Sequence, residues 1–284
     1  MMKIPTHLFL LLVLLSFSAL ASDDNSEQLA SVLAAQSSEV QARYIYRHPQ
    51  ETLSFFGIRP GMTVVEALPG GGWYTKILLP YLGSDGQLIG VDYSAEMYPL
   101  FGFFSEEQLK EKDAWVEDFT ADAVEWGGED GAAVSAFVFG SIPEDMKGKA
   151  DAVLFIRALH NLARFEGQGS YLSMALKNAF DLLKPGGVVG VVQHEGRDGM
   201  PDDWAGGQMG YLKQSFVIAK MEEAGFEFVA NNDINNNAKD QPTETDIVWR
   251  LPPSYATSRD NVELKAEMEA IGESNRMTLM FRKS

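Results

Sequence analysis

The chain of 284 residues contains no cysteine. Without a thiol it forms no disulfide, offers no thiolate ligand to a metal ion, and lacks the residue that carries the anchor of a lipoprotein. Histidine is scarce too, with four residues in the whole sequence. The places where those few imidazoles fall in the fold therefore carry information.

Positive charge is also in short supply. The 23 lysines and arginines face 40 aspartates and glutamates, which leaves a formal net charge of −17. A field of this sign repels DNA, RNA and anionic headgroups. We expect a small-molecule substrate and no nucleic-acid partner, and the composition leaves the oligomeric state open.

Long apolar runs are missing except at the N-terminus. Lys3 precedes an apolar run over residues 8–20, which is followed by the small-residue sequence Ala19-Leu20-Ala21. A run of about thirteen residues is short for a bilayer span, which takes about twenty. The pattern predicts a cleaved signal peptide over residues 1–21, no stable membrane anchor after cleavage, and a periplasmic or secreted protein.

The rest of the chain shows no repeat and no low-complexity linker. Its length suits one large α/β domain with a sizeable core. We expect a single domain over residues 22–284, in which residues 22–60 form leading helices and residues 61–284 form the α/β core. Apolar positions at helical steps predict a helix over residues 26–47, and a second short helix follows near residues 51–56.

An apolar strand runs into a glycine turn at residues 64–75, with the sequence VVEALPGGGWYT. Glycine lets the backbone approach a ligand closely, and the free N–H groups at the start of the next helix can donate to it. About twenty residues later Asp92 ends a second apolar strand, where a carboxylate can accept from ribose hydroxyls. The pair predicts a site for a nucleotide-like ligand, although a purely structural turn also explains the glycines.

Further strand-like runs follow at the spacing of successive βαβ units. They fall at residues 134–139, 151–161, 182–194, 226–230 and 277–282. This order predicts an α/β fold, with a doubly wound, mostly parallel seven-stranded sheet and helices on both faces.

These motifs resemble the class I S-adenosylmethionine-dependent methyltransferases. In that family the first loop reads acid, apolar, Gly, any, Gly, any, Gly; Glu66, Gly70 and Gly72 match it, and Leu68 stands in place of the first glycine. The resemblance implies a Rossmann-like fold whose last strand is antiparallel within the sheet, and S-adenosylmethionine as the cofactor. The binding residues it implies are Glu66, Pro69, Gly70, Gly71, Gly72, Asp92, Ser141 and Ile142, the last two beside the adenine.

Three segments resemble one bacterial branch of that family, whose members carry secretion signals. They are LPGGGWYT at residues 68–75, RALHN at residues 157–161 and IGESNRMTLM at residues 271–280. The resemblance implies methyl transfer to a small-molecule or exported acceptor and names no particular acceptor. It also leaves open how a secreted enzyme would obtain a cofactor that is made in the cytosol.

Two histidines fall at strand exits on the same edge of the predicted sheet. His160 follows the fourth strand and His194 closes the fifth, with Arg157 and Asn161 beside the first. We predict that His160 is the general base, that Arg157 and Asn161 orient the substrate, and that His194 belongs to the same catalytic group. Hydrogen-bonded structural imidazoles are the alternative.

Two charged segments have open roles. Arg43, Tyr46, Arg47 and His48 either contact the substrate from a lid or lie on a helix surface. Residues 273–276 either face the crevice or form an ion-paired turn. Aromatic residues after the second strand either floor an apolar pocket or pack in the core, namely Tyr98, Phe101, Phe103, Phe104, Trp115, Phe119 and Trp126.

Two other functions remain alternatives. The first is a non-catalytic or repurposed periplasmic binding protein, for which Leu68 would mark altered chemistry. The second is a metal-assisted hydrolase, whose ligands would come from His160, His194, Glu195, Asp198, Asp202 and Asp203. No close ligand spacing such as H-x-x-x-H occurs, so we predict no metal-binding residue.

Overall fold

The structure is a computed structural model, and it describes residues 24–284. The predicted signal peptide over residues 1–21 lies outside the described residues. Within residues 24–284, no helix combines the length and the apolar character needed to cross a bilayer.

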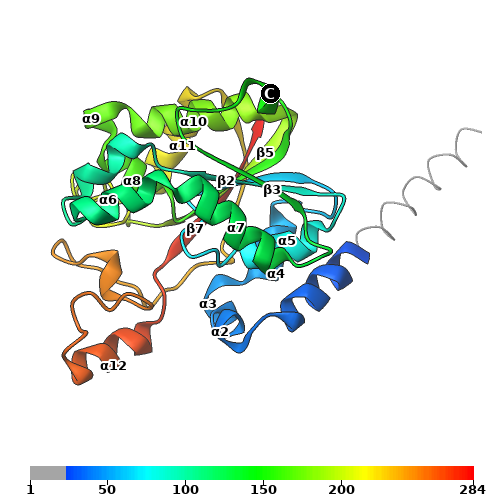
Figure 1. Cartoon of the computed structure of the whole chain (residues 1–284). Helices are drawn as coiled ribbons and strands as arrows, with labels where there is room; N and C mark the ends of the chain where they lie inside the picture. Colours follow the sequence, from blue (N-terminus) through cyan, green and yellow to red (C-terminus); the bar gives the residue numbers. More distant parts are fainter. Residues whose placement is uncertain (1–23) are drawn as a thin grey trace, which may run out of the picture.

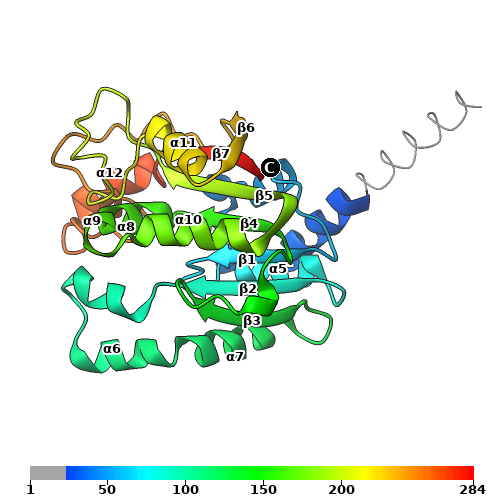
Figure 2. The same cartoon turned by 90° about the horizontal axis from the view of Figure 1, so that it is seen from above.

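Seven strands form one sheet in the order β3-β2-β1-β4-β5-β7-β6 (Figure 2). Their bounds are β1 Thr63–Ala67, β2 Gln87–Asp92, β3 Ala133–Val138, β4 Ala150–Ile156, β5 Leu183–His194, β6 Phe226–Asn232 and β7 Arg276–Lys283. The pairs among β1 to β5 are parallel, whereas β7 is antiparallel to both β5 and β6. The predicted fold class is confirmed, including the antiparallel last strand inside the sheet.

Helices cover both faces of the sheet (Figure 1). They are α2 Ser38–Gln41, α3 Tyr44–Arg47, α4 Pro49–Phe55, α5 Thr75–Leu82, η1 Ala95–Phe101, α6 Glu106–Asp113, α7 Trp115–Gly127, η2 Glu144–Met146, α8 Leu159–Arg164, α9 Glu166–Gly169, α10 Tyr171–Leu182, α11 Gln214–Glu223, η3 Val248–Arg250 and α12 Val262–Ile271. A further helix covers residues 24–35.

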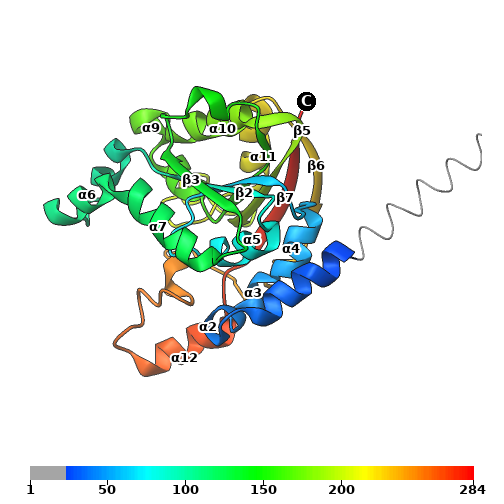
Figure 3. The same ribbon diagram turned by 45° about the vertical axis from the view of Figure 1, so that its right-hand side comes forward.

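Two apolar cores lie on opposite faces of the sheet. Val64 and Leu154 pack with α4, α5 and α7, whereas Val65 and Phe155 pack with α8, α10 and α11. Successive side chains of a strand point to opposite faces, so each strand feeds both cores and reads as a continuous apolar run. Figures 1 and 3 show α10 and α11 on one side, and α4 with the leading helices on the other.

The leading segment is broken where one continuous helix was expected over residues 26–47. The Ser37 hydroxyl caps α2 by accepting from the Val40 amide, and α3 ends at His48, whose φ of 39° is left-handed. A side-chain cap and a left-handed residue both stop the helical hydrogen-bond pattern. After the breaks, α2 and α3 place Val40 and Arg47 on the wall of a cavity at the ends of β1, β4 and β5.

A capping box at Ser105 begins α6. The Ser105 hydroxyl accepts from the Gln108 amide at 3.2 Å, and the Gln108 side chain accepts from the Ser105 amide at 2.9 Å. The helix ends at Asp113. Trp115 begins α7, where its ring stacks on that of Phe119 with centroids 5.0 Å apart.

Candidate functional site

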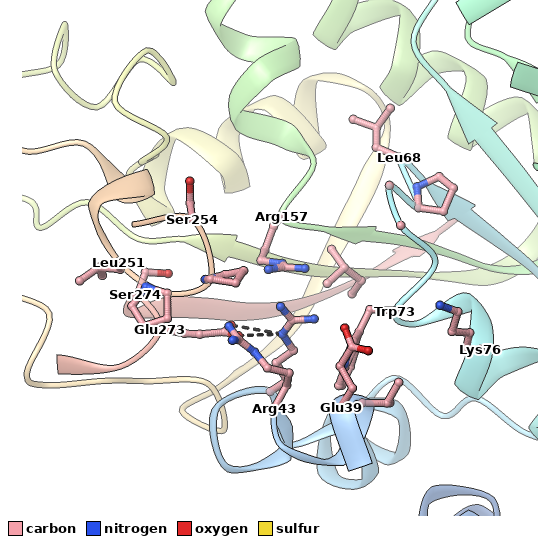
Figure 4. A pocket seen from close by; sticks show the side chains of 18 of the residues that line it. Glu39, Arg43, Leu68, Trp73, Lys76, Arg157, Leu251, Ser254, Glu273 and Ser274 are labelled. Atoms are coloured by element: carbon pink, nitrogen blue, oxygen red, sulfur yellow. Dashed lines mark hydrogen bonds and ion pairs between the residues drawn. The ribbon is translucent and has the colours of Figure 1, made fainter. Parts of the chain in front are cut away.

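A cavity of about 1080 Å³ opens where β1, β4 and β5 end. Its walls come from the glycine turn, the two histidine-bearing strand exits, helices α2 and α3, and residues 248–254 and 273–274 (Figure 4). In the sheet order, β1 and β4 are the neighbours between which a doubly wound chain reverses direction, and ligands bind at such a point. The volume is slightly above the usual range for small-molecule sites, about 300–1,000 Å³.

The glycine turn forms one wall. A Cβ added at Gly70 or Gly71 would meet no atom within 4 Å, so both backbones face open space, and both line the cavity together with Pro69. A Cβ at Gly72 would lie 2.2 Å from the Trp126 ring, so this third glycine is needed for packing against α7. The predicted cofactor-binding role therefore fits the positions of Gly70 and Gly71. Gly72, which was also predicted to bind the cofactor, instead packs against Trp126 and does not line the cavity.

Leu68 occupies a glycine-like backbone conformation. Its φ is 56°, and its amide donates to the Val91 carbonyl at 2.7 Å. A left-handed conformation costs a residue with a Cβ about 1–2 kcal/mol. The turn thus keeps the backbone path that a glycine would take at this position, while the Leu68 side chain lines the cavity.

Glu66 lies beneath the turn and outside the cavity. Its carboxylate is 3% exposed and accepts from the Thr75 hydroxyl at 2.7 Å. Burial raises the pKa of Glu66 to about 7, against a smaller lowering by that hydrogen bond. The side chain ties β1 to the start of α5 and holds the turn in place.

Asp92 ends β2 as predicted, but its carboxylate is already engaged. It accepts from the Tyr98 hydroxyl at 2.5 Å and from the Tyr93 amide at 2.8 Å. Burial raises the pKa of Asp92, and these two hydrogen bonds oppose the rise. Tyr98 belongs to η1, so a ribose could reach this carboxylate only after η1 had moved the phenol aside.

Ser141 and Ile142, predicted beside the adenine, follow β3 outside the cavity. The exposed Ser141 hydroxyl donates to the Val138 carbonyl at 2.8 Å, and Ile142 packs against the core on the α10 face. The cavity extends from the glycine turn toward β4 and β5, away from these two residues.

Three arginines surround one buried carboxylate. Glu273 accepts from Arg43, from Arg47 Nε at 2.9 Å and from Arg276 Nη1 at 2.7 Å. Burial alone would raise the pKa of Glu273, but the charges of Arg276, Arg47, Arg157 and Arg43 outweigh it and lower the pKa to about 2. Residues 273–276 were expected either to face the crevice or to form an ion-paired turn. Glu273 does both, because it lines the cavity and also forms ion pairs.

In the helical segment that precedes β1, the backbone carbonyl of Tyr46 accepts a hydrogen bond from Arg276. His48 supplies the left-handed turn that ends α3. Neither residue lines the cavity, whereas Arg43 and Arg47 do.

His160 is held as a neutral imidazole with one defined tautomer. The side-chain amide of Gln193 donates to the carbonyls of His194 and Gly210, so its oxygen faces His160 Nδ1 at 3.3 Å. An oxygen acceptor there requires the proton on Nδ1, which leaves a lone pair on Nε2. Burial lowers the pKa of His160 to about 4, with a smaller lowering by Arg157.

His194 lies beside it, with ring centroids 5.3 Å apart. Its Nδ1 is 2.6 Å from the Ser274 hydroxyl. Burial lowers the pKa of His194, and the nearby His160 and Arg157 lower it further. Both imidazoles line the cavity and are neutral at physiological pH, as a general base must be before it accepts a proton.

Asn161 and Arg157 complete the predicted catalytic group. The Asn161 amide donates to the Tyr93 hydroxyl at 2.9 Å, and both Asn161 and Arg157 line the cavity. All four predicted catalytic residues therefore meet at one site.

Sequence reasoning missed several aromatic and basic residues of the walls. These are Trp73 and Lys76 near the glycine turn, and Trp249 in η3, whose ring centroid is 5.7 Å from that of His160. Trp126 also lines the cavity, and it is one of the aromatic residues expected either in a pocket or in the core. Trp73 directly follows the glycine turn, a position that could have marked it. The others come from helix surfaces or an irregular segment, where no spacing signals a cavity.

A metal-assisted hydrolase would take its metal ligands from the histidines and the nearby acidic residues. Within residues 24–284, no three His, Asp or Glu side chains gather in an arrangement that could hold a metal ion.

Comparison with known proteins adds to this geometry. No protein-family model and no curated protein sequence matches the chain. Among solved structures, the [4+2]-cyclase SpnF aligns with a TM-score of 0.54 and 17% identity, over 84% of this chain and 80% of SpnF. A chain from the complex of the Haloferax volcanii Trm112 methyltransferase activator with a methyltransferase aligns with a TM-score of 0.50 and 13% identity, over 90% of this chain and 96% of that one.

The fold is the Rossmann-like methyltransferase fold. An Aquifex aeolicus protein described as a SAM-dependent methyltransferase also aligns, with a TM-score of 0.49 and 18% identity, over 73% of this chain and 93% of that one. These neighbours include a cyclase as well as methyltransferases, so the reaction has to be argued from the site itself.

Proposed function

We propose that this protein is an S-adenosylmethionine-dependent methyltransferase that acts on a small-molecule or exported acceptor in the periplasm. One observation carries the proposal: a single cavity joins the open glycine turn to the Nε2 lone pair of a neutral histidine, at the reversal point of a methyltransferase fold. The signal-like sequence of residues 1–21 supports the location.

The cavity fits such a donor in size and in lining. The backbones of Gly70 and Gly71 are open to a ligand, and the amides that start α5 lie just beyond them. Asp92 would accept from the ribose hydroxyls once Tyr98 had released it. When bound, S-adenosylmethionine supplies a methyl group whose bond to sulfur breaks with the electron pair left on sulfur, while the acceptor lone pair forms the new bond to carbon.

The residues of the chain then have two tasks. The walls align the acceptor with the methyl group, which is the main requirement of an in-line displacement. For an oxygen or nitrogen acceptor, His160 Nε2 receives the proton, and the Gln193 oxygen stabilises the imidazolium through Nδ1–H. Gln193 therefore positions the base without touching the acceptor.

Donor binding is the first test. We expect calorimetric titration of the chain from Ser22 with S-adenosylmethionine and S-adenosylhomocysteine to give saturable binding. Asp92→Asn, which keeps the shape of the side chain, should weaken it about tenfold, since charge-assisted hydrogen bonds to the ribose are each worth about 1.5–3 kcal/mol. Asp118→Asn, at an exposed position of α7, is the matched control.

The outcomes separate the candidate functions. A folded chain that binds neither ligand would refute the methyltransferase proposal. It would favour the repurposed binding protein, a candidate that the engagement of Asp92 by Tyr98 supports. Once an acceptor is known, His160→Gln should leave donor affinity unchanged and lower turnover about 10²-fold or more; unchanged turnover would reject the general-base role.

A further inference from the structure

Arg157 differs from the other arginines of the site because its charge has no partner. Its guanidinium makes no hydrogen bond and no ion pair with any residue from 24 to 284, and its Nε is buried. Burial lowers the pKa of Arg157, while the charge of Glu273 acts against that lowering. Arg157 as a whole is half-buried, and a guanidinium that is partly removed from water without a partner is costly in a folded protein, so its retention calls for a ligand.

The neighbouring carboxylates do not supply that partner. Glu273 already accepts hydrogen bonds from the guanidiniums of Arg43, Arg47 and Arg276. One carboxylate thus already pairs with three cations, and Arg157 is not among them. Glu39, the other carboxylate on the cavity wall, is exposed and forms no ion pair within the described residues. In Figure 4 the Arg157 guanidinium lies at the centre of the cavity, between the Glu273 cluster and the glycine turn.

The backbone of Arg157 supports a functional reason for its position. Its φ of 58° is left-handed, a conformation that is unfavourable for a residue with a Cβ. The Arg157 amide donates to the Val192 carbonyl at 2.6 Å, which holds the residue at the exit of β4. Strain of this kind persists where the surrounding structure holds it, and it concentrates at sites that bind ligands.

We infer that the acceptor carries an anionic group, a carboxylate or a phosphate, and that this group binds the Arg157 guanidinium. The planar fork of arginine donates two parallel hydrogen bonds to either group. Arg43 and Arg47 keep the surrounding potential positive in a chain of net charge −17. The inference rests on the proposed function in calling this ligand the acceptor.

The position of Arg157 gives the anion a consequence for catalysis. Arg157 precedes His160 by three residues at the same strand exit, and both line the same cavity. An acceptor anchored through its anionic group would thus present the rest of its structure near the Nε2 lone pair.

The test uses two simple anions as probes. The chain from Ser22 is titrated with inorganic phosphate and, separately, with succinate at constant ionic strength, and binding is followed by calorimetry and by thermal unfolding. We expect saturable binding with a rise in Tm. Arg157→Gln should weaken it at least tenfold, Arg157→Lys should restore part of it, and Arg282→Gln, at the far end of β7, should leave it unchanged.

Arg157→Gln also has a readout that needs no ligand. Because it removes a half-buried guanidinium that has no hydrogen bond or ion pair within residues 24–284, the variant should unfold at a Tm equal to or above that of the unaltered chain. This result would show that lost anion binding does not come from lost folding. The inference would be overturned if a folded Arg157→Gln variant bound the anions as tightly as the unaltered chain does. It would also be overturned if the unaltered chain bound neither probe.

The donor also carries a carboxylate, so a final comparison separates the two ligands. If phosphate binds equally well with S-adenosylhomocysteine present, the anion site belongs to the acceptor, as inferred. If the two compete and Arg157→Gln loses both, Arg157 serves the donor and the inference fails. If the anion binds but no donor does, the methyltransferase proposal fails while the anion site stands.

Discussion

At the scale of single residues, Glu273 organises the charges of the site. It binds Arg43 and Arg47, which line the cavity, and Arg276, and its side chain thereby links α3 and its N-cap residue to β7. Segments more than 200 residues apart in sequence meet at this carboxylate. Because the guanidiniums are partly or wholly buried, the loss of their common partner would leave several cations uncompensated.

We therefore predict that Glu273→Gln lowers the free energy of unfolding by about 3 kcal/mol at pH 7, on the scale of 1.36 kcal/mol for each unit of pKa shift. The pKa of Glu273 is lowered from 4.5 to about 2, so this stabilisation is present above pH 4.5 and is lost as the pH falls toward 2. Urea unfolding of both proteins at pH 7 and at pH 3 measures the difference.

Glu39→Gln is the control, since the exposed Glu39 forms no ion pair within residues 24–284. It should change the free energy of unfolding by less than about 0.5 kcal/mol. A Glu273→Gln variant that is as stable as the control, or a difference from the unaltered protein that grows on acidification, would contradict the prediction.

At the scale of elements, η1 controls access to the end of β2. It places the Tyr98 hydroxyl on Asp92, and its aromatic side chains pack with neighbouring rings, among them Phe101 against Phe165 with centroids 5.0 Å apart. The Tyr98 phenol thus donates to the carboxylate that a ribose hydroxyl would otherwise reach. Binding of the donor through Asp92 must break this contact.

Tyr98→Phe is predicted to raise donor affinity about fivefold, because it removes a competing hydrogen bond worth about 1 kcal/mol. Calorimetric titration with S-adenosylhomocysteine measures the change. Tyr171→Phe, at a buried tyrosine of α10 on the face that packs against β5, is the matched control and should have no effect. Weaker binding by Tyr98→Phe would mean that the phenol helps to hold the donor.

At the scale of the whole molecule, charge and location go together. The chain is strongly acidic overall, yet the lining of its cavity is rich in arginine. An acidic surface repels nucleic acids and headgroups, while the basic residues at the sheet edge can still attract a small anion that enters the cavity.

The proposed location has a direct test. Expressed with its full sequence in a bacterium, the protein should be recovered from the periplasmic fraction with an intact mass that begins at Ser22. Ala21→Arg, which breaks the small-residue rule before the cleavage site, should leave the chain uncleaved. Recovery of full-length protein from the cytosol in both cases would disprove the secretory assignment.

Much of the fold was predictable from local patterns. Buried parallel strands read as apolar runs, and glycine marks where elements begin and end, so the sheet was predicted correctly. The leading helix was predicted too long, because its apolar periodicity continues through the breaks at Ser37 and His48. Periodicity reports which face is buried and says little about a cap.

The site was predictable in part. Residues 157–161 and His194 could be assigned to one sheet edge, because parallel strands bring their carboxyl ends together. The tautomer of His160 could not be read, since it depends on Gln193, whose amide is oriented by the carbonyls of His194 and Gly210. Sequence alone does not reveal such a relay of hydrogen bonds.

The sequence by itself determined the order of the strands along the chain, the glycine turn, the two histidine-bearing strand exits and the acidic charge, since each depends on neighbouring residues or on composition. Only the tertiary structure decided which charges have partners. Glu273 satisfies arginines from distant segments, Tyr98 engages Asp92, and the Arg157 side chain is left without an ion pair or hydrogen bond within the described residues. Pairing depends on distances of a few ångströms between distant segments, and those distances are set only when both cores have packed.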